Sequence, residues 1–80
     1  MTDDELIAEQ FNQLGAKITY YRRLRKMKQI DLAYEVGISE QYLSRIERGR
    51  QATGLTIMTL LKLADKLNVK VEDFFRDKEE

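Results

Sequence analysis

The segment at residues 29–49, QIDLAYEVGISEQYLSRIERG, is the feature that most constrains the fold of this 80-residue chain. Its apolar residues recur at the spacing that lets two short helices share one core. These residues are Leu32, Val36, Ile38, Leu43 and Ile46. Gly37 follows the first apolar run, where a left-handed backbone ends a helix at little steric cost. Ser39 can cap the next helix through its hydroxyl. The segment therefore predicts helices over about residues 29–36 and 40–48, joined by a tight turn.

A longer amphipathic helix is predicted before this pair. Thr2 and Glu5 have the spacing of a capping box, and Asp3 and Asp4 suit the positive end of a helix dipole. An apolar stripe with helical spacing follows. Its members are Ile7, Phe11, Leu14, Ile18 and Tyr21. We expect one helix over about residues 3–25. A break near Gly15 is the alternative, because glycine inside a helix costs about 1 kcal/mol relative to alanine.

The chain after the pair predicts two further helices. Thr56 can cap the first of them, and Asn68 is expected to end it. The apolar stripe of this helix comprises Ile57, Leu60, Leu61, Ala64 and Leu67. A last short helix carries Phe74 and Phe75. Three apolar residues lie beside the main stripes, and either fringe the core or form a patch for a partner chain. They are Leu24, Met58 and Leu63.

Composition excludes several classes of function. The chain has no Cys and no His, which excludes thiolate or imidazole metal sites and catalytic pairs that need either residue. No apolar run approaches the roughly 20 residues that span a bilayer, and the acidic N-terminus is unlike a signal peptide. We therefore expect a helical globular domain with no cofactor, no metal and no membrane contact, in a reducing compartment such as the cytoplasm.

Charge is balanced over the whole chain but is unevenly distributed. Residues 17–50 hold nine basic and four acidic side chains, a net charge of +5. Residues 1–16 hold four acids and no base, and residues 51–80 hold five bases and six acids. Nucleic-acid binding needs a local basic patch, because phosphate neutralisation acts over about a Debye length. The alternative is an ordinary solvated basic surface.

A helix-turn-helix of this kind places its second helix in the major groove of DNA. Four polar positions lie on one face of the predicted helix at residues 40–48, opposite Leu43 and Ile46. They are Glu40, Gln41, Ser44 and Arg45. Glutamine can hold adenine through two hydrogen bonds, arginine can hold guanine, and glutamate can accept from cytosine. These four are the candidate base contacts, with a plain polar helix surface as the alternative.

The sequence as a whole resembles the Cro/C1 type of helix-turn-helix regulators, also called the XRE family. The resemblance is carried by LGAKI (14–18), YRRLRKMKQ (21–29), QIDLA (29–33), EVGIS (35–39), YLSRIERG (42–49) and TLLKLADKLNV (59–69), followed by Phe74 and Phe75. It implies an all-α, five-helix, lambda-repressor-like domain over residues 14–76, with the helix-turn-helix at about 29–48. Residues 1–13 form a helical leader outside the resemblance, and residues 77–80 form a charged tail.

The resemblance also implies roles for single residues. The matching positions of family members support base contact by the four polar residues named above. Gln29 matches a glutamine that binds backbone phosphate beside a helix N-terminus. Arg22 and Glu47 match a buried ion pair. Further candidates for phosphate contact are Lys28, Tyr42, Arg48, Arg50, Gln51 and Thr53. For the loop residues among them, a solvated loop is the alternative.

Two departures from the family pattern are visible. Lys26 stands where the family often has glycine, which predicts that the first helix ends without the usual left-handed cap. The loop at residues 50–56 is longer than usual and lacks a common proline.

The sequence therefore predicts a sequence-specific regulator of transcription that binds double-stranded DNA and has no catalysis of its own. A repressor or a restriction–modification controller fits, and family members usually bind palindromic operators as homodimers. The other hypothesis is a protein-interaction module such as an antitoxin. An enzyme is disfavoured, because the carboxylates are scattered and no nucleophile has a base beside it.

Overall fold

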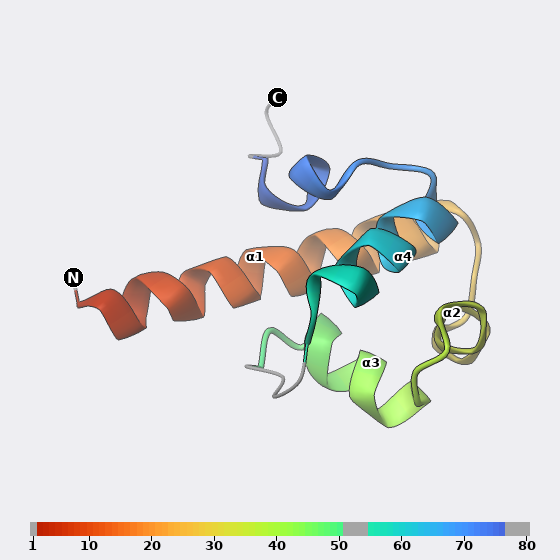
Figure 1. Ribbon diagram of the computed structural model, residues 1–80, viewed down its shortest axis with the longest axis horizontal. Helices are drawn as coiled ribbons and strands as arrows, with labels where there is room; N and C mark the ends of the chain where they lie inside the picture. The colour runs from red at the N-terminus through yellow and green to blue at the C-terminus, as the bar shows by residue number, and fades with distance from the viewer. Residues whose placement is uncertain (1, 51–54, 77–80) are drawn as a thin grey trace.

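The computed structural model describes residues 2–50 and 55–76, and all regular structure within them is helical. The elements follow in the order α1 (Asp3–Leu24), α2 (Gln29–Val36), α3 (Glu40–Glu47), α4 (Ile57–Leu67) and η1 (Val71–Phe75). The long α1 runs the length of the molecule, with α2 and α3 on one side of it and η1 on the other (Figure 1). No helix in these ranges combines the length and the apolar character needed to cross a membrane.

The fifth helix of the expected fold is a single 3₁₀ segment. η1 has five residues, and residues three apart in a 3₁₀ helix lie on the same side. This spacing turns both Val71 and Phe74 toward the core, where Phe74 is fully buried. The Lys70 backbone N–H donates to the Asp73 carboxylate at 2.9 Å and closes the turn. The described domain therefore has four α-helices and one 3₁₀ turn, and the prediction of five helices is wrong.

α1 begins and ends with well-formed caps. The Glu5 N–H donates to the Thr2 hydroxyl at 3.2 Å and the Thr2 N–H donates to the Glu5 carboxylate at 2.7 Å, which confirms the capping box. The hydrogen bond that the Thr2 N–H donates to the carboxylate stabilises its charged form and holds the pKa of Glu5 below its ordinary value. At the other end, Lys26 adopts φ 59° and the Met27 N–H reaches the Arg22 carbonyl at 3.1 Å. The left-handed cap is thus present without glycine, contrary to the sequence prediction.

Gly15 lies inside an unbroken α1, so the alternative of a break at this residue is wrong. A β-carbon here would collide with the Ile46 carbonyl oxygen and would lie 2.7 Å from that of Glu47. The missing side chain therefore lets the α1 backbone approach the C-terminal turn of α3 directly. This close approach fixes where α3 sits on the long helix.

The core lies where the five elements meet. α1 packs on α3 and η1, and α2 packs on both α3 and α4. The buried apolar residues are Leu14, Ile18, Leu32, Ala33, Val36, Leu43, Ile46, Leu63, Ala64, Leu67 and Phe74. Leu63 therefore belongs to the core, whereas Leu24 and Met58 are exposed.

Three residues assigned to apolar stripes do not lie in the core. Ile7, Ile57 and Leu61 are all exposed. Ile7 stands in turns of α1 that extend beyond the packed part of the domain. Ile57 and Leu61 instead lie at the border of the α4 face that buries Leu63, Ala64 and Leu67. Their exposure leaves apolar surface on α1 and α4.

The ends of α1 and α4 are linked by one arginine. The Arg25 guanidinium Nε donates to the Leu67 carbonyl oxygen at 2.8 Å, at the C-terminus of α4. A cation at this end satisfies a carbonyl that lacks an intrahelical partner and complements the helix dipole. Arg25 therefore has a structural role that its place in a basic segment did not indicate.

Replacing Gly15 with Ala is expected to lower the free energy of unfolding by about 1–3 kcal/mol, because a β-carbon must push α1 away from α3. At an ordinary helical position the same change gains about 1 kcal/mol. Urea unfolding followed by circular dichroism measures the difference. The exposed neighbour Ala16 supplies the control: Ala16→Gly should lose about 1 kcal/mol from helix propensity alone. A Gly15→Ala protein as stable as the parent would contradict the close approach.

Candidate nucleic-acid interface

The turn between α2 and α3 sets the angle at which α3 leaves the domain. Gly37 has φ 86°, and its N–H donates to the Ala33 carbonyl at 2.9 Å. The next residue, Ile38, donates to the same carbonyl at 3.0 Å. The Tyr42 N–H then donates to the Ser39 hydroxyl at 3.0 Å, which confirms Ser39 as the cap of α3.

One side of α3 faces the core and the other faces solvent. Leu43 and Ile46 are almost completely buried. On the opposite side Glu40, Gln41 and Arg45 are exposed. Ser44 is half-buried, and its hydroxyl accepts a hydrogen bond from Arg48 Nη1 at 2.9 Å. α3 lies at the edge of the molecule farthest from η1, so nothing in the described body covers its outer face (Figure 1).

The C-terminus of α3 is anchored by a buried ion pair. Arg22 Nε lies 2.8 Å from Glu47 Oε2, and Arg22 Nη2 donates to Glu47 Oε1 at 3.0 Å. The two side chains are only 11% and 4% exposed. The remaining guanidinium nitrogen, Nη1, donates to the Met27 carbonyl oxygen at 2.9 Å, which ties the pair to the turn before α2. The structure thus brings together the two residues that the resemblance paired.

Two more polar side chains converge on the same carboxylate, although the single Thr19 hydroxyl proton is shared with the Gly15 carbonyl oxygen, 2.9 Å away. Thr19 Oγ1 lies 3.0 Å from Glu47 Oε1, and Gln29 Nε2 donates to that oxygen at 3.1 Å. Glu47 is therefore bonded to α1 and to the first residue of α2. Across the described residues, every buried side-chain nitrogen and oxygen has a hydrogen-bond partner. The sequence did not single out Thr19, because its partner lies far along the chain and no local pattern marks it.

Gln29 occupies the position at which phosphate contact was predicted, but its amide is also part of this cluster. An amide NH₂ has two donors, and the bond to Glu47 uses one of them. The side chain is thereby held at the N-terminus of α2, where backbone N–H groups favour an anion.

The other candidate phosphate contacts border α2 and α3. Lys28 is the exposed N-cap of α2, and its backbone N–H lies 3.3 Å from the Asp31 carboxylate. Arg48 and Arg50 are exposed beyond the end of α3, whereas Tyr42 is half-buried against the core. Gln51 and Thr53 lie outside the described residues.

Three of the four acidic side chains in the basic segment, residues 17–50, are paired with other groups of the protein. Glu47 is buried with Arg22, and Glu35 lies 3.5 Å from Lys66 of α4. Asp31 accepts the Lys28 N–H. Glu40 is the acid that stands on the exposed face of α3. The arrangement presents amide, guanidinium and ammonium donors at the exposed side of α2 and α3, which suits an anionic partner.

Comparison with known proteins identifies the same architecture elsewhere. Residues 18–74 match a family profile described as "Helix-turn-helix". An uncharacterized HTH-type transcriptional regulator of Methanocaldococcus jannaschii is 39% identical over 59 residues, covering 74% of this chain and 86% of that protein.

Solved structures of other proteins are similar as well, among them the following two. The N-terminal DNA binding domain of SinR from Bacillus subtilis superimposes with a TM-score of 0.74 at 33% identity, covering 86% of this chain and 99% of that one. The restriction-modification controller protein C.AhdI from Aeromonas hydrophila gives a TM-score of 0.73 at 25% identity, covering 81% and 96%.

Replacing Arg22 with Met should cost about 3–5 kcal/mol of unfolding free energy, because it leaves the Glu47 carboxylate buried without its cation. The double variant Arg22→Met/Glu47→Leu should recover much of this loss. Lys66→Met is the matched control at an exposed pair, and should lose no more than about 1 kcal/mol. Chemical denaturation measures all three. A loss for Arg22→Met as small as that for Lys66→Met would show that the pair does not hold the fold.

Proposed function

The chain belongs to the Cro/C1-type helix-turn-helix family of transcriptional regulators, and from that membership we propose that it binds a specific double-stranded DNA site with α3 in the major groove. The observation that carries the proposal is the division of α3 into two faces. Leu43 and Ile46 are buried while Gln41 and Arg45 are exposed on a helix that nothing in the described body covers.

Base recognition is assigned to the outer face of α3. Gln41 can donate to and accept from the edge of adenine, and Arg45 can donate two hydrogen bonds to guanine. Glu40 can accept from the amino group of cytosine and Ser44 can contact any base. Ser44 is the least accessible of the four, since Arg48 already donates to its hydroxyl.

Phosphate contacts would fix the position of α3 without reading sequence. Lys28 and Gln29 at the N-terminus of α2 can bind one phosphate region, and Arg48 and Arg50 can bind another beyond α3. Tyr42 stays a candidate, as do Gln51 and Thr53 in the segment outside the described residues. Because these groups include several cations, affinity should fall steeply with salt.

The regulatory role that fits best is a small repressor or a restriction–modification controller acting on chromosomal or mobile DNA in the cytoplasm. The likeness to the controller from Aeromonas hydrophila supports this choice. A single α3 contacts few bases, so discrimination requires two copies on half-sites about 34 Å apart. We therefore propose a homodimer bound to a palindromic operator.

Arg45→Ala should weaken binding to the preferred site by about 1–3 kcal/mol and relax base preference at one position. Lys28→Ala is the matched control, because it also removes one exposed cation but should weaken all sequences alike and reduce the salt slope by about one. Selection from a random duplex pool, followed by titrations at several salt concentrations, measures both effects.

The results can also refute the proposal. An equal loss on every sequence for Arg45→Ala would place Arg45 on phosphate rather than on a base. Weak binding of the parent protein to all duplexes at low salt would instead favour the protein-interaction module, in which the fold serves as an antitoxin or a similar partner.

A further inference from the structure

The first turns of α1 project beyond the packed domain (Figure 1). Every residue at positions 2–10 is exposed, and Leu6 and Ile7 are 49% and 46% exposed. Helices in proteins gain most of their stability from packing an apolar face, which this segment lacks within the described chain. These residues are the exposed part of the leader expected at residues 1–13, and from here on the leader means residues 2–10.

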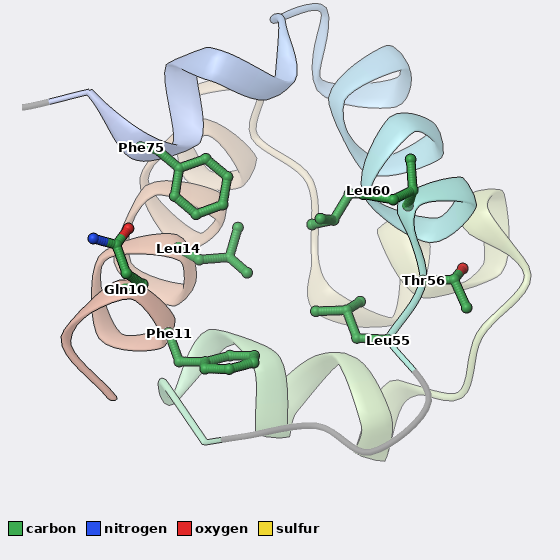
Figure 2. A pocket seen from close by; sticks show the side chains of 8 residues that line it. Gln10, Phe11, Leu14, Leu55, Thr56, Leu60 and Phe75 are labelled. Atoms are coloured by element: carbon green, nitrogen blue, oxygen red, sulfur yellow. The ribbon is translucent and has the colours of Figure 1, made fainter. Parts of the chain in front are cut away.

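An apolar pocket opens where the leader joins the domain. Its volume is about 290 Å³, and it lies between α1, α4 and η1. Phe11 and Leu14 enter it from α1, Leu60 from α4 and Phe75 from η1 (Figure 2). The full lining comprises Gln10, Phe11, Leu14, Leu55, Thr56, Ile57, Leu60 and Phe75. The volume is sufficient for an aliphatic side chain.

Exposed apolar residues extend the apolar surface of the pocket along α1 and along α4. On α1, Ile7 lies one turn before Phe11 on the same face. On α4, Ile57 is 70% exposed at the pocket rim, and Leu61, one turn later, is 53% exposed. Ile7 and Leu61 each stand one helical turn from a residue that lines the pocket, and we call this set, with Ile57 and the pocket, the apolar strip. Isolated apolar residues, by contrast, are the norm on protein surfaces.

We propose that this strip is the contact between two copies of the chain, in which the leader of each copy lies across the pocket of the other and inserts Ile7. The inference deepens the homodimer of the proposed function and rests on it. It assigns the contact to a segment that lies outside the matched family region, which begins at residue 18.

The spacing along α1 suits a two-fold axis. If two α1 helices cross antiparallel near residue 9, residue 7 of each lies beside residue 11 of the other, which brings each Ile7 to a pocket lined by Phe11. A two-fold contact is self-complementary, so both pockets are filled by one arrangement. Glu9 points about 200° away from Ile7 around the helix, so the two Glu9 carboxylates stay apart at the axis.

The charges of the two copies are also complementary in this arrangement. The leader carries four acids and no base, whereas α4 carries Lys62 directly after the exposed Leu61. Asp3 precedes Ile7 by four positions, and Ile57 precedes Leu61 by four positions. With Ile7 at the rim near Ile57 of the other copy, Asp3 comes to the level of Leu61 along α4, where the exposed Lys62 borders the strip about 100° around the helix. A second copy therefore supplies both the apolar side chain and the opposite charge that the strip requires.

The first experiment uses the absence of cysteine from the chain. Ile7→Cys and Ile57→Cys proteins, each with one thiol, are mixed and treated with a short thiol-reactive crosslinker. The mixture should yield a covalent heterodimer. Glu9→Cys mixed with Ile57→Cys is the matched control and should yield far less, because position 9 is on the opposite face of the same helical turn. Equal yields would overturn the assignment of the leader to the pocket.

The second experiment measures self-association by sedimentation equilibrium. Ile7→Glu should weaken it by about tenfold or more, since two buried aliphatic side chains are lost from one dimer. Glu9→Ala should have little effect. Lys62→Glu should also weaken association, and adding Asp3→Lys and Asp4→Lys to it should restore much of the loss. Circular dichroism and thermal melting check that each variant is folded.

The outcomes separate this inference from the proposed function. If Ile7→Glu and the charge reversals leave self-association unchanged, the leader is not the contact, even if the parent protein selects a palindromic duplex. If crosslinking and self-association behave as expected but no duplex sequence is selected, the leader contact stands and the DNA-binding function fails.

Discussion

The Arg22–Glu47 pair is the interaction on which the placement of α3 depends. Glu47 is the last residue of α3, and its carboxylate accepts hydrogen bonds from α1 and from the start of α2. Burying this carboxylate is unfavourable unless every oxygen is satisfied, and here Arg22 and Gln29 donate to both oxygens. The cluster therefore joins the exposed helix to two neighbours through a group that cannot move without leaving a charge unpaired.

A second constraint acts beside the first. The bare backbone at Gly15 lies against the last carbonyls of α3, so the same end of α3 is held by steric contact as well as by charge. At the other end, the Gly37 turn and the Ser39 cap define where α3 begins. The start of α3 is thus determined by interactions between residues close in sequence, the Gly37 turn and the Ser39 cap. Its end is determined by contacts with residues far along the chain.

This division explains what the sequence could predict. The bounds of α2, the caps at Thr2, Ser39 and Thr56, and the outer face of α3 follow from local spacing, and the structure has all of them. The role of Arg25 depends on Leu67, far along the chain, and no local pattern reveals such a partner. Periodicity also could not distinguish core from exposed apolar surface at Ile57, because both produce the same stripe. Lys26 was mispredicted because a left-handed residue costs a non-glycine side chain only about 1–2 kcal/mol, which one well-formed cap can offset.

The convergence of three helices on Glu47 also bears on how the domain would meet a ligand. Side chains that are ordered only on association lose rotamer freedom, and that loss weakens binding. Gln29 is already held by Glu47 before any partner arrives, so its conformational entropy is largely lost during folding rather than at the encounter. Gln29 would therefore contact a partner with little further loss of rotamer freedom, whereas the exposed Gln41 and Arg45 lose theirs only on association.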